Sequence, residues 1–148
     1  MGINIRQKGA DAERHVATTL NTIIQEELAA IGREVTRPVV QRNQNQSAVG
    51  GGDLSNVFGL SIEVKRQEAL SIEAWWKQCV DAAKRNNEIP ILLFKQSHKA
   101  WRCITEGWVG FSEDSWAQYR LEISWEHFLD AFRSHVRSRL IAGDEVRT

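Results

Sequence analysis

One short segment near the middle of the chain has a strict two-residue alternation that suits a β-strand. Residues 60–65, LSIEVK, alternate between apolar and polar side chains. Because successive side chains of a strand point to opposite faces of a sheet, one face of this strand must be buried and the other must be polar. The segment therefore predicts a half-buried strand whose polar face carries Glu63 and Lys65.

Three other segments have helical periodicity. Apolar residues recur every three or four positions over residues 11–31, with Gly9 before the start and Gly32 after the end. Ser71 and Ser124 are N-cap residues for two further helices, which we expect over about 71–85 and 124–141. We expect the outer face of the last helix to carry Arg133, Arg137 and Arg139.

The remaining regular segments read as strands. Residues 34–42, EVTRPVVQR, are rich in β-branched residues, and Pro38 restricts them to an edge or bulged strand. Residues 53–65 predict a hairpin, residues 89–94 a central strand, and residues 100–105 its hairpin partner. The order helix, three strands, helix, two strands, helix predicts an α/β (α+β) domain with a mixed sheet flanked by helices.

Composition limits the class of protein. A chain of 148 residues has room for one domain, here 1–148, with one hydrophobic core. Positive and negative side chains balance at 19 each, so the net charge does not indicate a polyanionic partner. No apolar run reaches the ~20 residues of a membrane span, so we expect a cytoplasmic protein without a membrane partner. Cys79 and Cys103 lack metal-binding spacing, and we expect both to be reduced and buried.

The polar face of the 60–65 strand has the residue types of a metal site. Glu63 and Lys65 point the same way, about 6.5 Å apart, with the carbonyl of Val64 between them. If Asp53 lies across the hairpin, two carboxylates and a carbonyl suit a hard cation such as Mg²⁺. Such an ion activates water, and an adjacent lysine can orient it toward a phosphodiester. The alternative is a solvent-facing cross-strand salt bridge.

Two helical residues support the metal site. Glu13 lies one turn before Val16, on the core-facing side of the first helix, where a carboxylate can serve as a further ligand. The alternative is a first-turn glutamate that is favoured by the helix dipole. Gln78, one turn beyond Trp75, can point inward over the sheet and orient a lysine or a water molecule.

Four motifs in this order resemble the PD-(D/E)XK nuclease superfamily: KGADAER at 8–14, GD at 52–53, IEVK at 62–65 and WKQ at 76–78. Within it, residues 6 to 104 are most similar to archaeal-type Holliday junction resolvases and their phage relatives. The resemblance implies a restriction-endonuclease-like fold, a homodimer, and Mg²⁺-dependent cutting of branched DNA that leaves 5′-phosphates, with Mn²⁺ able to substitute.

The resemblance also implies roles for single residues. The catalytic set that it implies is Glu13, Asp53, Glu63, Lys65 and Gln78, with a metal held by Asp53, Glu63, the Val64 carbonyl and Glu13. The superfamily has a proline where this chain has Gly52, so we expect a less constrained backbone approach to the metal.

Basic residues cluster around the expected metal site. Lys8 and Arg14 flank the helix start and Arg42 precedes the glycine-rich loop, so these cations can contact DNA phosphates. Ordinary solvated charges are the alternative. Ser47 matches a loop serine that is frequent in the family. Trp108 and Trp116 are less clearly core residues than the other tryptophans, and Trp108 could stack on an unpaired base.

These observations lead to three hypotheses. The first is a homodimeric Holliday junction resolvase, a metal-dependent endonuclease of DNA recombination and repair, in phage or host cytoplasm. The second keeps the nuclease fold but changes the substrate to linear, flap or mismatched DNA, because metal motifs do not encode branch recognition. The third is a non-catalytic DNA-binding or interaction module whose acidic cluster is structural.

Overall fold

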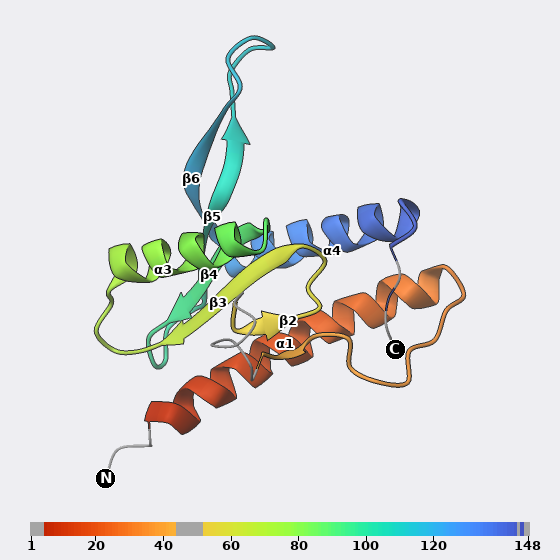
Figure 1. Cartoon of the computed structure of the whole chain (residues 1–148), viewed down its shortest axis with the longest axis horizontal. Coiled ribbons are helices and arrows are strands. Elements are labelled where there is room, and N and C mark those ends of the chain that lie inside the picture. The colour runs from red at the N-terminus through yellow and green to blue at the C-terminus, as the bar shows by residue number, and fades with distance from the viewer. Residues whose placement is uncertain (1–4, 44–51, 145, 147–148) are drawn as a thin grey trace.

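The chain forms a mixed β-sheet covered by helices on both faces (Figure 1). The computed structural model describes residues 5–43, 52–144 and 146. Its elements are, in chain order, α1 (Ile5–Ala30), β1 (Gln41–Arg42), β2 (Leu54–Ser55), β3 (Leu60–Arg66), α3 (Ile72–Arg85), β4 (Ile89–Lys95), β5 (Arg102–Val109), β6 (Ala117–Ser124) and α4 (Trp125–Ile141). The predicted α+β architecture, with a mixed sheet between helices, is confirmed.

The main sheet has the strand order β3-β4-β5-β6. β3 and β4 are parallel, and the other two pairs are antiparallel. Parallel neighbours need a crossover connection, which α3 supplies between β3 and β4. β4 is buried from Pro90 to Phe94, as expected for a central strand with both faces covered.

The alternation in β3 assigns its side chains to two different cores. Leu60, Ile62 and Val64 belong to the larger core, which α1 and α4 share. The opposite face of the sheet packs against α3, where Trp75 and Cys79 contact β4 and β5 residues. Figure 1 shows α1 and α3 on opposite sides of β3 and β4. Glu63 therefore lies on the α3 side of the sheet, close to its edge.

Helix α1 is longer than the sequence predicted. It begins at Ile5 rather than near Asp11, so Gly9 lies inside the helix instead of before it. Its buried stripe matches the expectation except at Ile31, which lies just past the helix end and is exposed. Although α1 spans 26 residues, no helix among the described residues combines such length with the apolarity needed to cross a bilayer.

The strand predicted over residues 34–42 was wrong for most of its length. Only Gln41–Arg42 form a strand, and they pair with β2 in a separate two-stranded sheet. The Asn21 side chain explains the difference, because its Oδ1 accepts hydrogen bonds from the backbone N–H groups of Val39 and Val40 at 3.0 and 2.8 Å. A helix side chain thus takes the place of a neighbouring strand for this backbone.

The predicted hairpin over residues 53–65 is only partly right. β2 is two residues long and pairs with β1, whereas β3 pairs with β4. The turn between β2 and β3 includes Asn56, Phe58 and Gly59, all with positive φ, which lets the chain reverse sharply. A single backbone hydrogen bond, from Asp53 N–H to the Ile62 carbonyl at 2.7 Å, still joins the two arms.

The sheet has one strand more than predicted. β5 extends to Val109 instead of ending at 105, and β6 follows it over residues 117–124. The order is therefore helix, three strands, helix, three strands, helix. In the sequence of β6, AQYRLEIS, apolar and polar residues alternate as they do in β3. That alternation was the available signal for the missing strand.

The two later helices begin where they were predicted. The Ser124 hydroxyl accepts a hydrogen bond from the backbone N–H of His127 at 3.0 Å, which confirms it as the N-cap of α4. Ser71 precedes α3 but makes no capping hydrogen bond through its side chain. In α3 the buried residues are Trp75, Cys79, Ala82 and Ala83, whereas Val80, expected in the stripe, is only half-buried.

The arginines of α4 do not form a free outer face, contrary to the prediction. Arg137 donates through Nε to Glu27 of α1 at 2.7 Å, and Arg133 bonds Glu26 and approaches Glu27. Arg139 pairs with Asp144 and donates to the Phe58 carbonyl. The charged residues therefore fasten α4 to its neighbours, although the Arg137 side chain remains 61% exposed, as expected for an outer face.

Both cysteines are free and buried, as predicted. Burial raises the pKa of the Cys79 thiol and of the Cys103 thiol to about 12. Since the thiolate is the reactive form, these residues act as small apolar core residues in the folded chain.

The α1–α4 ion pairs lead to a stability prediction. Glu27 is 7% exposed and bonds two arginines, so Glu27→Gln removes charge-assisted hydrogen bonds from a buried position. We expect the free energy of unfolding to fall by about 1–3 kcal/mol in urea titrations. Glu26→Gln is the matched control, because the Glu26 side chain is 54% exposed, and it should cost less than about 1 kcal/mol. Equal losses in the two variants would contradict this assignment.

Candidate functional site

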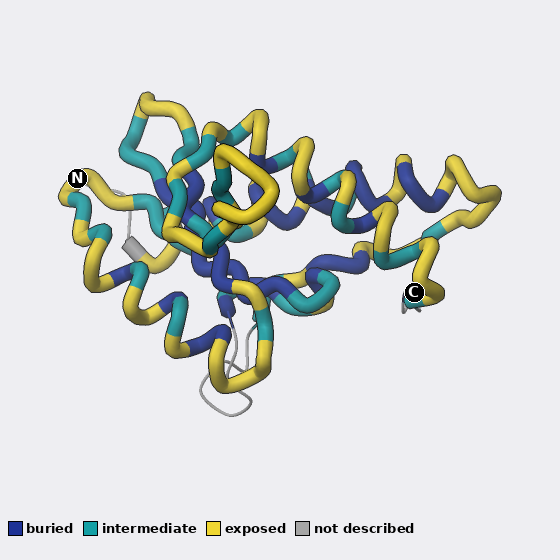
Figure 2. Tube along the Cα trace, turned by 90° about the horizontal axis from the view of Figure 1, so that it is seen from above, coloured by how far each residue is buried: buried dark blue, intermediate teal, exposed yellow. Residues whose placement is uncertain are grey.

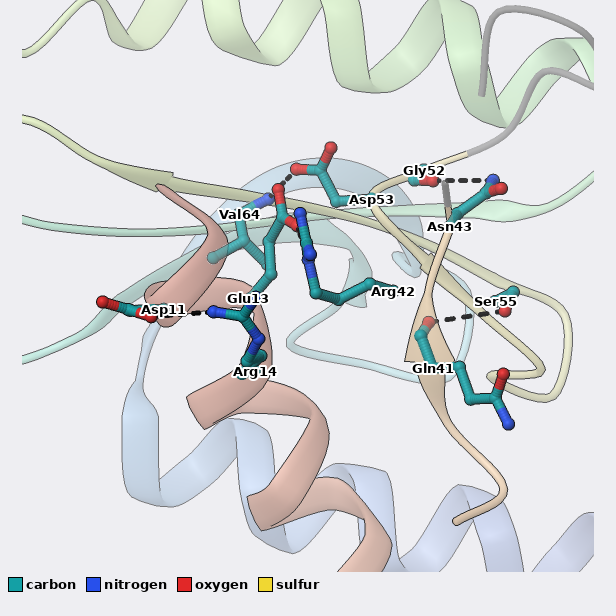
Figure 3. Close-up of polar contacts among 10 residues, drawn as sticks. All are labelled: Asp11, Glu13, Arg14, Gln41, Arg42, Asn43, Gly52, Asp53, Ser55 and Val64. Atoms are coloured by element: carbon teal, nitrogen blue, oxygen red, sulfur yellow. Dashed lines mark hydrogen bonds and ion pairs between the residues drawn. The ribbon is translucent and has the colours of Figure 1, made fainter. Parts of the chain in front are cut away.

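The candidate site forms along the edge of β3 that does not pair with β4, where Asp53 is attached by two hydrogen bonds. Figure 3 shows the bond between Asp53 and Val64. The Asp53 backbone N–H donates to the Ile62 carbonyl, and the Asp53 carboxylate accepts from the Val64 N–H, both at 2.7 Å. The N–H and C=O of one strand residue point to the same side, so the Val64 carbonyl faces this edge too. The chain thus brings Asp53 beside the strand that carries Glu63 and Lys65.

Gly52 allows this attachment because it lies against the backbone of β3. A Cβ atom at Gly52 would lie 2.5 Å from the carbonyl oxygen and 2.6 Å from the nitrogen of Ile62. No residue with a side chain can occupy that position without a backbone shift. The expectation that Gly52 loosens the approach to the metal was wrong: the glycine fixes Asp53 tightly against the strand.

Asn43 is a supporting residue that the sequence analysis missed. Its backbone N–H donates to the Asp53 carbonyl at 2.8 Å, and its side-chain amide donates to the Gly52 carbonyl at 3.1 Å. Figure 3 shows Asn43 beside Gly52 and Asp53, at the end of β1. An asparagine that follows a strand is common in turns, so the sequence gave only a weak signal for this role.

Glu63 is a buried carboxyl group that lacks a full counter-charge. It is 5% exposed, although it lies on the polar face of β3. Burial, the charge of Asp53 and a hydrogen bond with Asp53 raise the pKa of Glu63 to about 8, whereas the charge of Lys65 lowers it. In the absence of a cation, the Glu63 carboxyl group therefore keeps its proton near neutral pH.

Glu13 reaches the same place from α1, as predicted, but it is already paired. Arg42 of β1 donates through Nε to the Glu13 carboxylate at 2.7 Å (Figure 3). Burial and the charge of Asp53 raise the pKa of Glu13, while Arg42 and the charge of Lys65 lower it. The mutual effects of Glu13, Asp53 and Lys65 show that the three side chains lie within electrostatic range.

The donor set suits a hard divalent cation. Two carboxyl groups, Asp53 and Glu63, lie in hydrogen-bond contact, and the Val64 carbonyl points to the same edge. Oxygen ligands of this kind are preferred by Mg²⁺. Among the described residues, no three acidic, histidine or cysteine side chains gather closely enough to hold a metal without the help of a carbonyl or water. Glu13, bound by Arg42, lies next to this set.

The other predicted site residues lie apart from this cluster or outside the description. Gln78 is exposed on α3, contrary to the inward orientation that was expected. Lys8 pairs with Glu68 at 3.0 Å, and Arg14 pairs with Asp11 one turn earlier at 2.8 Å. Ser47 and most of the glycine-rich loop fall within residues 44–51, outside the described part of the chain.

Comparison with known proteins supports a nuclease. The family model described as "Phage putative PDDEXK endonuclease" matches residues 4–131. Among solved structures, Hjc, a Holliday junction resolvase from the archaeal hyperthermophile Archaeoglobus fulgidus, superimposes with a TM-score of 0.46 at 16% identity. The superposition covers 83% of this chain and 96% of Hjc. The curated protein sequences include no match.

Adding one methyl group at Gly52 tests how closely the backbone at this residue approaches β3. Gly52→Ala places a Cβ into the backbone of Ile62, so we expect the free energy of unfolding to fall by about 1–3 kcal/mol. Gly9→Ala is the control, because nothing lies within 4 Å of its Cβ position and the residue is inside α1. That control should stabilise the chain by about 0.5–1 kcal/mol. A neutral result for Gly52→Ala would contradict the close approach of the two backbones.

The pKa of Glu63 predicts how stability depends on pH in metal-free buffer. Its ordinary pKa of 4.5 is raised to about 8 in the folded chain, so the folded state binds the proton more tightly than the unfolded state. This contribution to stability is complete below pH 4.5 and is lost as the pH rises to 8. The slope reaches at most about −1.4 kcal/mol per pH unit.

Urea titrations between pH 5 and pH 8 would measure that slope. Glu63→Gln, which cannot ionise, should flatten it. Glu68→Gln is the control, because a hydrogen bond from Ser97 and the contact with Lys8 lower the pKa of Glu68 to about 2. Glu68 is therefore ionised throughout the range, and its removal should leave the slope unchanged. Parallel slopes for wild type and Glu63→Gln would show that Glu63 is ionised in the folded protein.

Proposed function

Because the chain belongs to the phage PDDEXK endonuclease family, we propose that it is a metal-dependent endodeoxyribonuclease that resolves four-way DNA junctions. The observation that carries the proposal is the pairing of Asp53 with Glu63 at the edge of β3. Ionising a buried carboxyl group beside a second carboxyl group is costly unless a cation offsets the charges. The pair thus has the chemistry of a metal site.

Each residue of the site has a distinct role in this proposal. Asp53, Glu63 and the Val64 carbonyl would hold Mg²⁺, or Mn²⁺ in its place. When bound, such an ion makes its water a stronger nucleophile and offsets the negative charge that develops on the phosphate. Lys65, whose charge acts on both Glu63 and Glu13, would orient the attacking water. Arg42 fixes one oxygen of Glu13 and leaves the rest of that carboxylate facing the site.

DNA binding is assigned to the cations around this edge. Arg14 and Arg42 line a groove of about 400 Å³ between α1 and β1, next to Glu13. Lys8 lies one turn before Asp11 on the same helix. Each of these cations has a carboxylate partner, so DNA phosphates would exchange one anionic partner for another. Ser47 is assigned to DNA contact by resemblance alone.

The choice of a four-way junction rests on the motif resemblance. The order and spacing of the four motifs resemble those of junction resolvases, which act as homodimers that nick two opposed strands. A homodimer and 5′-phosphate products belong to the same proposal. Nuclease action on linear, flap or mismatched DNA is the alternative, because residues that bind a metal do not select branch geometry.

Cleavage of labelled synthetic DNA tests the proposal. We expect Mg²⁺- or Mn²⁺-dependent cutting of a four-way junction and none in EDTA. Asp53→Asn and Lys65→Ala should each lower the rate by about 100-fold or more, because the metal site supplies several kcal/mol of transition-state stabilisation. Glu126→Gln, which alters an exposed carboxylate in the first turn of α4, is the control and should keep full activity.

The same assay separates the alternatives. Equal cutting of linear, flap and four-way DNA in competition would retain the nuclease and reject junction selectivity. Tight junction binding without cleavage under any divalent ion would support a non-catalytic DNA-binding module. Metal-independent cutting, or full activity in both site variants, would reject the metal site at Asp53 and Glu63.

A further inference from the structure

Strands β5 and β6 continue beyond the sheet as a two-stranded arm, residues 107–119. Gly107 pairs with Tyr119, Trp108 with Gln118, and Val109 with Ala117 along the arm. Figure 1 shows the arm standing away from the body of the domain, and its tip, residues 111–116, is exposed. A two-stranded hairpin is at best marginally stable in water. An arm of this kind therefore gains stability from whatever covers it.

The arm carries most of the exposed large hydrophobic residues of the described chain. These residues are Ile31, Ile89, Trp108, Phe111, Trp116, Tyr119 and Ile141. Four of the seven lie on the arm, where Phe111 is 97% exposed and Trp108 is 64% exposed. Exposed aromatic residues gathered on one element typically mark an interaction site.

The arm does not extend toward the candidate metal site. Ile62 of β3 pairs with Ile91 of β4, which pairs with Thr105 of β5. β5 is antiparallel to both strands, so the arm continues past the N-terminal end of β3, while Lys65 lies toward its C-terminal end. Val109 is four residues, or about 13 Å along the strand, beyond the level of Ile62. The arm is thus a second surface, separate from the catalytic edge.

The charge of the arm disfavours nucleic acid as its partner. Aromatic residues can stack on unpaired bases, but such sites combine stacking with cations that follow the phosphate backbone. Residues 107–119 include no lysine, arginine or histidine, and they include Glu113 and Asp114 at the tip. Two carboxylates at the most exposed point would repel phosphates, so the arm suits a protein surface with apolar residues and a positive charge.

The same chain has a mostly apolar groove on other elements. The groove has a volume of about 320 Å³ and lies where the C-terminal ends of α1 and α4 meet. Its lining is mostly apolar, and it includes Ile31 and Ile141, two of the three remaining exposed hydrophobic residues. Arg137, whose side chain is 61% exposed, lies at the groove, where it pairs with Glu27, whose side chain is only 7% exposed. The volume lies within the range of pockets that bury small apolar groups.

We propose that the arm docks into the α1–α4 groove of a second copy of this chain. Phe111 and its neighbouring tryptophans enter the apolar groove, while Glu113 and Asp114 approach Arg137. One contact of this kind would cover Phe111 and Trp116 at the exposed tip of the arm (Figure 2), together with Ile31 and Ile141 of the groove. The inference identifies a surface for the homodimer of the proposed function, but it does not require nuclease activity.

A two-fold axis would make the contact reciprocal. Each arm would enter the groove of the other copy, so that the assembly closes at two chains and leaves no open end. Pairing of two arms with each other is less favourable, because it would bring the four carboxylates of two tips together.

Light scattering and sedimentation of the metal-free, DNA-free protein test the inference. We expect a dimer, and a rise in its dissociation constant of about 10-fold or more for Phe111→Ser on the arm or Ile141→Ser in the groove. A mixture of the two variants should associate more tightly than either alone, because both substitutions then fall on the same one of the two contacts. Among the described residues, Ile89 is the exposed large hydrophobic residue that lies outside both surfaces, so Ile89→Ser is the matched control and should leave the dimer intact.

Cross-linking identifies which surfaces of the two chains meet. Ser112→Cys at the tip and Ala30→Cys in the groove should form a disulfide between chains when the two variants are mixed, since the natural cysteines are buried. Thermal melts establish that each variant folds. A monomer at all concentrations, or a dimer unaffected by Phe111→Ser and Ile141→Ser, would overturn the inference. An arm variant that stays dimeric but binds DNA more weakly would also overturn it and assign the arm to nucleic acid.

Discussion

The hydrogen bonds between Asp53 and the edge of β3 hold the candidate site together. They occupy the Ile62 carbonyl and the Val64 N–H, two backbone groups that an edge strand would otherwise leave to water or to another chain. The same bonds bring the Asp53 side chain into hydrogen-bond contact with Glu63. They depend on Gly52, because any side chain at that position would separate the two backbones. Residues 52 and 53 thus determine both the backbone arrangement at the edge of β3 and the position of a carboxyl group in the candidate site.

Acidic and basic side chains both surround that segment. Glu13, Asp53 and Glu63 bring three carboxyl groups to one side of the domain, and Lys65 and Arg42 supply two cations. Arg42 bonds Glu13 directly, whereas the raised pKa of Glu63 lets that carboxyl group hold a proton. A divalent cation would release that proton, so metal affinity is expected to rise with pH. The family membership and the local electrostatics therefore point to the same chemistry.

The sequence predicted the parts of the fold that depend on local periodicity. The alternation in residues 60–65 assigned Glu63 and Lys65 to one face, and the N-cap at Ser124 marked the start of α4. The sequence did not predict contacts between residues that lie far apart in the chain. Nothing near residue 39 indicates that Asn21, on another element, would bind that backbone in place of a strand. Likewise, helical spacing does not reveal that Arg137 would face Glu27 across two helices, or that Gln78 would be exposed.

The two buried thiols give the folded chain a chemical property of its own. Cys79 of α3 lies in the core between the sheet and α3, and Cys103 of β5 lies in the larger core. Both thiols are protonated at neutral pH. Alkylating reagents attack only thiolates that solvent can reach, so each cysteine is labelled only when the structure around it opens. The rate of modification at each cysteine therefore reports how often that layer opens. The native chain thus contains two thiols whose labelling rates measure local opening, one on either side of the sheet.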